Sequence, residues 1–302
     1  MKTIKAKIKK WAQMKMKSLN ALSVDRFAYI SRAEYLANCA QNCNEMGISA
    51  EKYCDNDIVV SLTTYGIRLF DVYLSIESIM QQTLKPNRLI LWLGDDLKDV
   101  HIPLILQKQQ KRGLEIRYCK DIGPYTKLIP ALKAFPSSCI ITVDDDHLYG
   151  FDLMENLVLA HKMKPEMVYC ARMHRMKLLS QKSFEKYQKW TQHYSHSDVS
   201  PLNFPAGVGG VLYPPHCFNE EVFNEEVFLD ICKYADDIWF KAMALYNGVM
   251  AQKIPFSRKN YATSDFVQKQ SLFNINVVKN MNDIQLKAVF DRYNLYEKLT
   301  IK

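Results

Sequence analysis

Three consecutive carboxylates, Asp144, Asp145 and Asp146, follow directly after the strand-forming run 139–143. Side chains alternate along an extended backbone, so we expect Asp144 and Asp146 to point to one side and Asp145 to the other. Two converging carboxylates repel each other unless a cation lies between them, and hard divalent cations prefer oxygen ligands. Such a cation completes its coordination with water and phosphate oxygens. The stretch therefore predicts a Mn²⁺ or Mg²⁺ site at Asp144 and Asp146 that bridges to a diphosphate, and the alternative is a solvated acidic turn.

A second acidic pair, Asp236 and Asp237, lies at the start of a predicted helix over 234–248 that Gly248 closes. Acids in a first helical turn ordinarily cap the helix or interact favourably with its dipole. A carboxylate can also act as a general base that accepts the proton of an attacking hydroxyl. The residue types alone leave both interpretations open.

Glycines are dense in the segment 204–215, which contains Gly207, Gly209 and Gly210 within four positions. Glycine allows unusual backbone dihedrals and close approach of the backbone to a ligand. An ordinary tight turn is the alternative. The preceding stretch 172–196 is rich in aromatic residues and methionine, and it predicts packing helices or a lid over an acceptor.

The elements that must position these residues alternate between strand and helix. Short apolar runs of strand length alternate with stretches whose apolar residues recur at helical spacing. This rhythm predicts βαβ units and a mainly parallel sheet with helices on both faces, in which ligands bind beyond the carboxyl ends of the strands. The expected strands are 57–63, 88–93, 114–118 and 139–143, and the expected helices are 24–48, 70–82, 99–112 and a short one near 126–135.

The composition is that of a folded protein, because 302 residues with 48% hydrophobic and 12% aromatic content can bury a substantial core. The eight cysteines show no CxxC or CxxH spacing, which favours reduced thiols that pack as small hydrophobes in a cytosolic, reducing compartment. No run of eighteen apolar residues and no uninterrupted apolar leader occur, so the sequence predicts neither a membrane span nor a cleaved secretory signal.

The net charge of +8 is concentrated at the N-terminus, where residues 1–24 hold seven lysines and no acid. The rest of the chain has 33 basic against 32 acidic residues. Nucleic-acid binding is therefore not expected, because it needs basic side chains clustered on a folded face. At helical spacing Ile4, Ile8 and Trp11 share one stripe with most lysines opposite. The pattern over residues 1–22 thus predicts either a helix that lies on an anionic membrane surface or a terminal helix that is solvated or loosely docked.

The order of these motifs resembles the N-terminal half of GT-A glycosyltransferases, particularly the large family-2-like group of bacterial surface-polysaccharide and lipooligosaccharide type. The resemblance spans roughly residues 57–150 and continues more loosely to about 255. It is carried by "IVVSLTTYGIR", by the turn "QQTLKP" and by "IITVDDDHLYG". One departure is the loop after the first strand, which reads Thr-Thr-Tyr-Gly where a Pro-x-Tyr-Asn-type sequence is usual.

The resemblance implies roles for the residues that match the family's motifs. The second strand of the family ends in an acid near the nucleotide, and "LGDD" offers Asp95 or Asp96. The implied nucleotide-sugar contacts are Thr63, Thr64, Tyr65, Arg68, Asp95, Lys127, Asp144 and Asp145, although a lone lysine such as Lys127 is more often a surface charge. The implied cation ligands are Asp144 and Asp146, the implied sugar and acceptor pocket includes Gly209 and Gly210, and the implied catalytic base is Asp237, with Asp236 as second choice.

The sequence thus predicts an α/β protein with a GT-A, Rossmann-like, mainly parallel sheet, flanking helices and an N-terminal helical extension. The expected domains are a basic helical extension over 1–56 and a glycosyltransferase domain over 57–302, divided into a nucleotide-sugar and metal half (57–150) and an acceptor half with a C-terminal helix (151–302).

The predicted activity is that of a hexosyltransferase-type enzyme. It would use Mn²⁺ or Mg²⁺ to transfer a sugar, with inversion, from a nucleotide-diphosphate donor to a glycan or glycolipid acceptor. The expected location is the cytoplasm or, through residues 1–22, the inner face of the membrane. Two alternatives stay open: a sugar-phosphate nucleotidylyltransferase, and a non-catalytic scaffold that binds sugar nucleotides or membranes.

Overall fold

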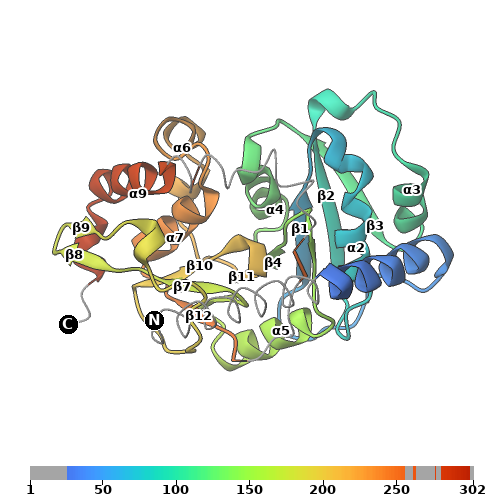
Figure 1. The fold of residues 1–302 in the computed structure, drawn as a ribbon, viewed down its shortest axis with the longest axis horizontal. Helices are drawn as coiled ribbons and strands as arrows, with labels where there is room; N and C mark the ends of the chain where they lie inside the picture. The colour runs from blue at the N-terminus through green and yellow to red at the C-terminus, as the bar shows by residue number, and fades with distance from the viewer. Residues whose placement is uncertain (1–25, 256–260, 263–275, 277–279, 300–302) are drawn as a thin grey trace, which may run out of the picture.

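A seven-stranded sheet forms the centre of the protein, and the computed structural model describes residues 26–255, 261–262, 276 and 280–299 (Figure 1). Its strands are β1 (Ile58–Thr63), β2 (Arg88–Gly94), β3 (Leu114–Cys119), β4 (Cys139–Thr142), β6 (Val168–Cys170), β11 (Val211–Tyr213) and β12 (Ala251–Lys253). They lie in the order β12-β6-β11-β4-β1-β2-β3. All neighbours pair in parallel except β11, which runs antiparallel to β4 and β6. The expected α/β class with a mainly parallel sheet is confirmed.

Helices cover both faces of this sheet (Figure 1). They are α2 (Val72–Met80), α3 (Leu104–Gln110), α4 (Ile129–Ala134), α5 (Leu153–Met163), α6 (Glu225–Ile231), α7 (Asp236–Tyr246) and α9 (Met281–Arg292). Residues of α2, α3 and α5 pack on one face, and residues of α4, α6, α7 and α9 pack on the other. Successive residues of β1 are accordingly buried on opposite sides, with Ile58 and Val60 toward the first group and Val59 toward the second. A strand buried on both faces needs a continuous apolar run, which is what this segment supplies.

Helix α3 is shorter than the expected helix over 99–112. Residues Asp95–Leu97 form a short 3-10 helix, and Pro103 is the N-cap residue of α3. Because the residue before a proline is disfavoured in helical conformation, Ile102 cannot extend the helix toward its N-terminus. Gly113 follows the helix with a φ of +106°, a conformation that glycine adopts without strain.

The expected packing helices over 172–196 are wrong. The segment contains the short strands β7 (Met173–Arg175), β8 (Leu178–Ser180) and β9 (Ser183–Phe184) and a 3-10 helix, Tyr187–Lys189. Strand β7 pairs antiparallel with β10 (Asn203–Pro205), and β8 pairs with β9. The partner strand of β7 lies thirty residues away in the sequence, so local periodicity carries no information about it. Pairing with this strand outweighs the helical preference of the segment. A further short pair joins β5 (His147–Leu148) to β13 (Tyr261–Ala262).

The segment before β1 packs against the sheet domain. Residues 26–42 are helical, and Leu36 and Ala40 in that helix are buried. The guanidinium of Arg32 lies 3.8 Å from the ring centroid of Phe151, which precedes α5. The basic segment 1–22 lies outside the described residues, so its proposed membrane contact stays a prediction. In the described part of the chain, no helix has the length and apolar character needed to cross a membrane.

Candidate functional site

Lys127 joins the two acidic segments that the sequence singled out. Its Nζ atom lies 2.9 Å from Asp144 Oδ1 and 3.0 Å from Asp236 Oδ2. Asp144 follows the carboxyl end of β4, and Asp236 is the first residue of α7. Lys127 ends the 3-10 helix Gly123–Lys127, and its carbonyl oxygen accepts a hydrogen bond of 2.6 Å from the hydroxyl of Ser61 in β1. The carboxyl ends of two adjacent parallel strands therefore anchor this cluster, at the edge where α/β sheets bind ligands.

The charge on Lys127 is held by its neighbours. The residue is only 8% exposed, and burial by itself lowers the pKa of an ammonium group. The carboxylates of Asp144, Asp236 and Asp237 outweigh that effect and raise the pKa of Lys127 well above its usual value. The cluster is therefore a buried cation surrounded by acids, a pairing that compensates the cost of burying either sign of charge.

Asp237 contacts the glycine-rich segment directly. Its Oδ2 atom accepts a 3.0 Å hydrogen bond from the backbone N–H of Gly207. A Cβ atom on Gly207 would lie 2.6 Å from Asp237 Oδ1 and 3.1 Å from Lys127 Nζ, so no larger residue fits without displacing the site. The N-cap position of α7 is Ala235, which forms no side-chain cap. Neither acid is therefore the N-cap residue of α7, and both carboxylates contact partners outside the helix, although both still lie in its first turn, where the helix dipole favours negative charge.

Burial raises the pKa of Asp237 to about 7, and the neighbouring charge of Asp236 adds to the shift. Lys127 and the N–H of Gly207 act in the opposite direction because they favour the ionised form. The pKa of Asp236 is also raised, again chiefly by burial and against the influence of Lys127. A carboxyl group with a pKa near neutrality can both accept and release a proton under physiological conditions.

Asp145 holds the turn after β4 in place. Its Oδ2 atom accepts a 2.6 Å hydrogen bond from the Thr64 hydroxyl, and its Oδ1 atom pairs with Arg68 at 2.7 Å. Its backbone oxygen accepts a 2.8 Å hydrogen bond from Ser75 of α2. Burial raises the pKa of Asp145 to about 6 although Arg68 favours the charged form. Both side-chain oxygens are thus engaged within the protein.

Asp146 also turns toward Arg68, at 3.3 Å, and pairs with His147 Nδ1 at 2.7 Å. Burial acts to raise the pKa of Asp146, but the hydrogen bond and charge of His147 prevail and lower it. The predicted alternation of side chains through 144–146 is wrong. Strand β4 ends at Thr142, and residues 145–146 form a turn, so Asp145 and Asp146 meet the same arginine while Asp144 reaches Lys127.

The donor set at this edge fits a hard divalent cation. The side chains of Asp144 and Asp146 are 26% and 18% exposed, whereas that of Asp145 is 7% exposed. Both oxygens of Asp146 face partners within the protein, His147 and Arg68, so a cation would bind there by displacing one of these contacts. Among the described residues, no three carboxylate, imidazole or thiol ligand atoms gather at this edge. A cation here would take one or two protein ligands and draw the remainder from water and phosphates, which is the usual arrangement for Mg²⁺ at phosphate sites.

Three further residues implied by the resemblance have other contacts. The hydroxyl of Thr63 donates a 3.0 Å hydrogen bond to the carbonyl of Trp92 in the neighbouring strand. Asp95 is half exposed and pairs with Lys98 at 2.9 Å. Tyr65 is 48% exposed, and the guanidinium of Arg68 lies 5.3 Å from its ring centroid. Nucleotide-sugar binding by these residues stays a prediction.

The structure distinguishes the three glycines of the glycine-rich segment. Gly209 passes so close to Arg172 that a Cβ atom would lie 2.4 Å from the Cβ of that residue. Gly210 has a φ of +89°, which a residue with a side chain adopts only with strain. Gly207, which the resemblance did not assign to the sugar and acceptor pocket, is the glycine that contacts the acids. The spacing of the triplet contains no signal that ranks its members.

Two residues that support the turn also escaped the sequence interpretation. The hydroxyl of Tyr149 accepts a 2.7 Å hydrogen bond from the backbone N–H of Asp144. The N–H of Tyr149 donates in turn to the hydroxyl of Ser78 on α2, at 3.1 Å. A lone tyrosine and a helical serine carry no recognisable motif, so only the tertiary structure shows that they hold Asp144.

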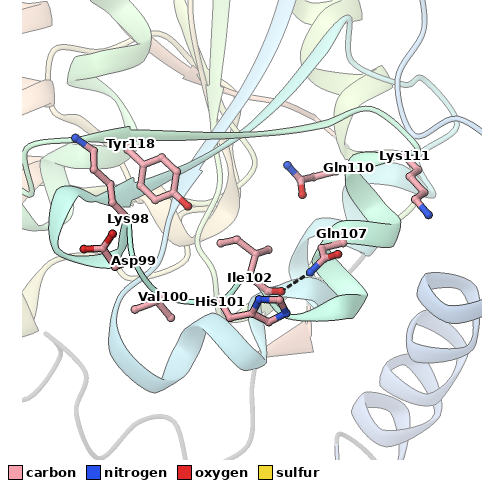
Figure 2. Close-up of a pocket in the computed structure, with 9 residues that line it drawn as sticks. All are labelled: Lys98, Asp99, Val100, His101, Ile102, Gln107, Gln110, Lys111 and Tyr118. Atoms are coloured by element: carbon pink, nitrogen blue, oxygen red, sulfur yellow. Dashed lines mark hydrogen bonds between the residues drawn. The ribbon is translucent and has the colours of Figure 1, made fainter.

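A surface concavity lies away from this cluster (Figure 2). It has a volume of about 820 Å³ and lies between the loop 98–102, α3 and Tyr118 of the edge strand β3. The side-chain amide of Gln107 in α3 donates a 2.8 Å hydrogen bond to the Ile102 carbonyl, and Figure 2 shows this contact among the lining residues. None of the acids around Lys127 lines it. Charge and hydrogen bonding, and not cavity volume, therefore identify the candidate site.

No known family model matches the chain, and no curated protein matches it. Among solved structures, S. aureus TarS 1–349 aligns with a TM-score of 0.46 at 16% identity, over 80% of this chain and 70% of that chain. The same fragment in complex with UDP gives 0.45 and 16%, over 78% and 69%. A longer TarS structure gives 0.46 and 16%, over 79% of this chain and 42% of its own length. Similarity this distant leaves function to be argued from the site itself.

Proposed function

We propose that this protein is a GT-A glycosyltransferase that moves a sugar from a nucleotide-diphosphate donor to a hydroxyl group of a glycan or glycolipid. The observation that carries the proposal is the meeting of Asp144, Asp236 and Asp237 around Lys127. Two acidic segments far apart in the sequence face one buried cation at the carboxyl edge of a parallel sheet. A glycosyl transfer needs this combination, because it requires a site for the charged diphosphate and a base for the acceptor hydroxyl.

Asp237 takes the role of general base in this proposal. Its pKa of about 7 lets it be ionised near neutral pH and still accept a proton. The N–H of Gly207 fixes one carboxylate oxygen at 3.0 Å, which orients the group. Deprotonating an acceptor hydroxyl as it attacks the sugar carbon from the side opposite the leaving group gives inversion.

Asp144 and Asp146 would hold a Mn²⁺ or Mg²⁺ ion. When bound, such an ion stabilises the charge that develops on a diphosphate leaving group. Lys127 keeps Asp144 and Asp236 oriented, and Arg68 does the same for Asp145 and Asp146. The ammonium and guanidinium groups also offset the negative charge that these acids and a diphosphate bring together.

The acceptor and the location follow from the basic N-terminus within this proposal. Residues 1–22, which lie outside the described residues, carry seven lysines. Contacts between lysines and an anionic surface contribute about 1 kcal/mol each. A glycolipid acceptor at the inner face of the membrane would therefore be within reach of the enzyme.

A donor screen tests the proposal. UDP-, GDP-, CMP- and TDP-sugars are each added to the full chain with Mn²⁺, Mg²⁺ or chelator, and melting temperature and release of the nucleoside phosphate are measured. We expect one nucleotide sugar to raise the melting temperature and to be hydrolysed slowly, only with metal, and we expect Asp146→Asn to lose both effects.

Three outcomes would reject the proposal. Stabilisation by a nucleoside triphosphate, with pyrophosphate released on adding a sugar phosphate, would identify a nucleotidylyltransferase. Donor binding without hydrolysis or transfer, unaltered by Asp237→Asn, would identify a non-catalytic scaffold. Absence of any metal-dependent response to all four donor classes would remove the nucleotide sugar altogether.

A further inference from the structure

Two thiols and an imidazole meet at the opposite edge of the sheet from the acids. The Sγ atom of Cys139 lies 3.2 Å from Nε2 of His161. Sγ of Cys54 completes the group, and all three atoms lie within 4.8 Å of one another. Within the described residues this is the one group of three such ligand atoms.

The fold brings the three residues together from separate segments. Cys139 is the first residue of β4, so the length of that strand separates it from Asp144. Cys54 lies in the loop before β1, and His161 lies in the last turn of α5. The loop is tied to the start of β4 by a 2.9 Å hydrogen bond from the Asn56 amide to the Ser137 carbonyl. A 2.9 Å backbone hydrogen bond from the N–H of Cys139 to the carbonyl of Asp57 ties the same two segments, so these contacts hold the loop beside β4 without involving either thiol.

We propose that Cys54, Cys139 and His161 bind a zinc-type divalent ion through two thiolates and one imidazole nitrogen. Thiolate and imidazole ligands select Zn²⁺ over Mg²⁺ or Mn²⁺, which prefer oxygen. In a tetrahedral zinc site with Zn–S of about 2.3 Å and Zn–N of about 2.0–2.1 Å, ligand atoms lie roughly 3.5–3.8 Å apart. The three ligand atoms are already gathered within 4.8 Å, so small side-chain rotations suffice.

Burial and charge suit the proposed ion. Cys139 and His161 are 0% and 2% exposed, while Cys54 is only half-buried and leaves a route for the ion and a solvent molecule in the fourth position. Two thiolates neutralise the charge of one divalent cation, so the complex can lie against the apolar side chains of α5 without an uncompensated charge.

Within the described part of the chain, the contact of Nε2 with the Cys139 thiol is the one polar contact found for the His161 imidazole. Nδ1 of His161 is buried and has no hydrogen-bond partner among the described residues. The 3.2 Å contact with Cys139 therefore orients the ring, and it brings Nε2 into the same group of ligand atoms as the two thiols.

Cobalt titration tests the proposal. The full chain is first freed of metal, and its thiols are kept reduced with a phosphine. Co²⁺ is then titrated in while the absorbance of the thiolate-to-cobalt band is followed, and Zn²⁺ is added last as a competitor. We expect a thiolate-to-cobalt charge-transfer band whose intensity corresponds to one thiolate-bound Co²⁺ per chain, and we expect Zn²⁺ to remove it. Cys54→Ala and His161→Gln should each weaken binding by more than about 100-fold, since loss of a partner that only supports a ligand already costs 10–100-fold.

Two matched variants make the result specific. Cys43→Ala removes a partly exposed thiol near the end of the N-terminal helix and should leave binding unchanged. Asp146→Asn, at the other edge of the sheet, should also leave the charge-transfer band unchanged, which separates this site from the one in the proposed function. Melting curves of all variants confirm that they are folded.

Three results would overturn the zinc site. The first is the absence of a charge-transfer band in the wild-type chain. The second is an equal weakening of Co²⁺ binding by Cys43→Ala and by Cys54→Ala. The third is a reduced chain that shows no thiolate-bound Co²⁺ while oxidation by air links Cys54 to Cys139. The last would identify the two cysteines as a redox pair.

Discussion

Replacing Asp237 by Asn is the most direct test of the proposed chemistry. The amide keeps the size of the side chain, and its oxygen can still accept the 3.0 Å hydrogen bond from the Gly207 N–H. It cannot accept a proton. Because α7 has Ala235 at its N-cap and no side-chain cap, the substitution removes no helix cap. The fold should therefore survive while the base is lost.

The expected loss is the usual contribution of a general base, roughly 10²- to 10⁴-fold in turnover. In activation free energy this is about 3–5 kcal/mol. Lys127 and the metal ligands are untouched, so donor affinity should change little. The assay compares kcat and donor KM of the wild type and Asp237→Asn with saturating Mn²⁺, and Asp230→Asn, an exposed acid on α6, serves as the matched control.

The pKa of Asp237 adds a pH signature. With a pKa of about 7, the base is lost by protonation as the pH falls, so wild-type kcat/KM should drop about tenfold per unit below pH 7. Asp237→Asn should lack this acid limb. Stability has the opposite trend. Since the folded-state pKa is raised above the unfolded value, the unfolded chain releases this proton first, and the group's contribution to stability is lost as the pH rises from about 4 to 7.

At pH 8 the Asn variant should therefore melt no lower than the wild type. Near-wild-type turnover by Asp237→Asn, with an unchanged acid limb, would refute the assignment of the base and transfer the test to Asp236. Equal losses in Asp237→Asn and Asp230→Asn would show a structural effect.

Three other predictions concern the metal, the central lysine and the tail. Asp146→Ala should abolish the Mn²⁺- or Mg²⁺-dependent donor binding measured by calorimetry, and Asp144→Ala should weaken it, with both variants still folded. Full transfer activity of Asp146→Ala, or of the wild type in chelator, would contradict the metal assignment. Lys127→Met leaves two carboxylates without their cation, so it should lower the free energy of unfolding in urea by about 3–5 kcal/mol and move the acid limb of the activity profile above pH 7. An unchanged unfolding midpoint would argue against the central ion pair. Deletion of residues 1–22 should preserve turnover of a soluble acceptor analogue but weaken co-sedimentation of the protein with anionic vesicles, and added salt should weaken the vesicle binding of the full chain in the same way. Vesicle binding that neither the deletion nor salt changes would reject the membrane contact.

Local pattern was enough to predict the elements that position the site. Strands β1 to β4 and helices α2, α4 and α7 lie where the apolar periodicity placed them, and the parallel order of the first strands follows from their alternation with helices. The position of Asp144, Asp145 and Asp146 just beyond β4 was predictable for the same reason. Periodicity shows which face of an element is apolar, and that pattern can be read from neighbouring residues alone.

Contacts between distant segments were beyond that reasoning. Only the packing of α7 against the sheet brings Asp236 and Asp237 to Lys127, and only the course of the glycine-rich loop places Gly207 beside them. The alternation rule failed at Asp146 because the strand ends before it.

The sequence by itself determined the strands and helices of the first half of the sheet, the fold class and the acidic segments at the candidate site. The tertiary structure decided which charges meet there, and it alone brings Cys54, Cys139 and His161 within 4.8 Å of one another although they are widely spaced along the chain. The physical reason is that periodicity encodes the burial of each residue. The partner of a buried polar atom, in contrast, is set by strand order, loop course and helix packing, which depend on the whole chain.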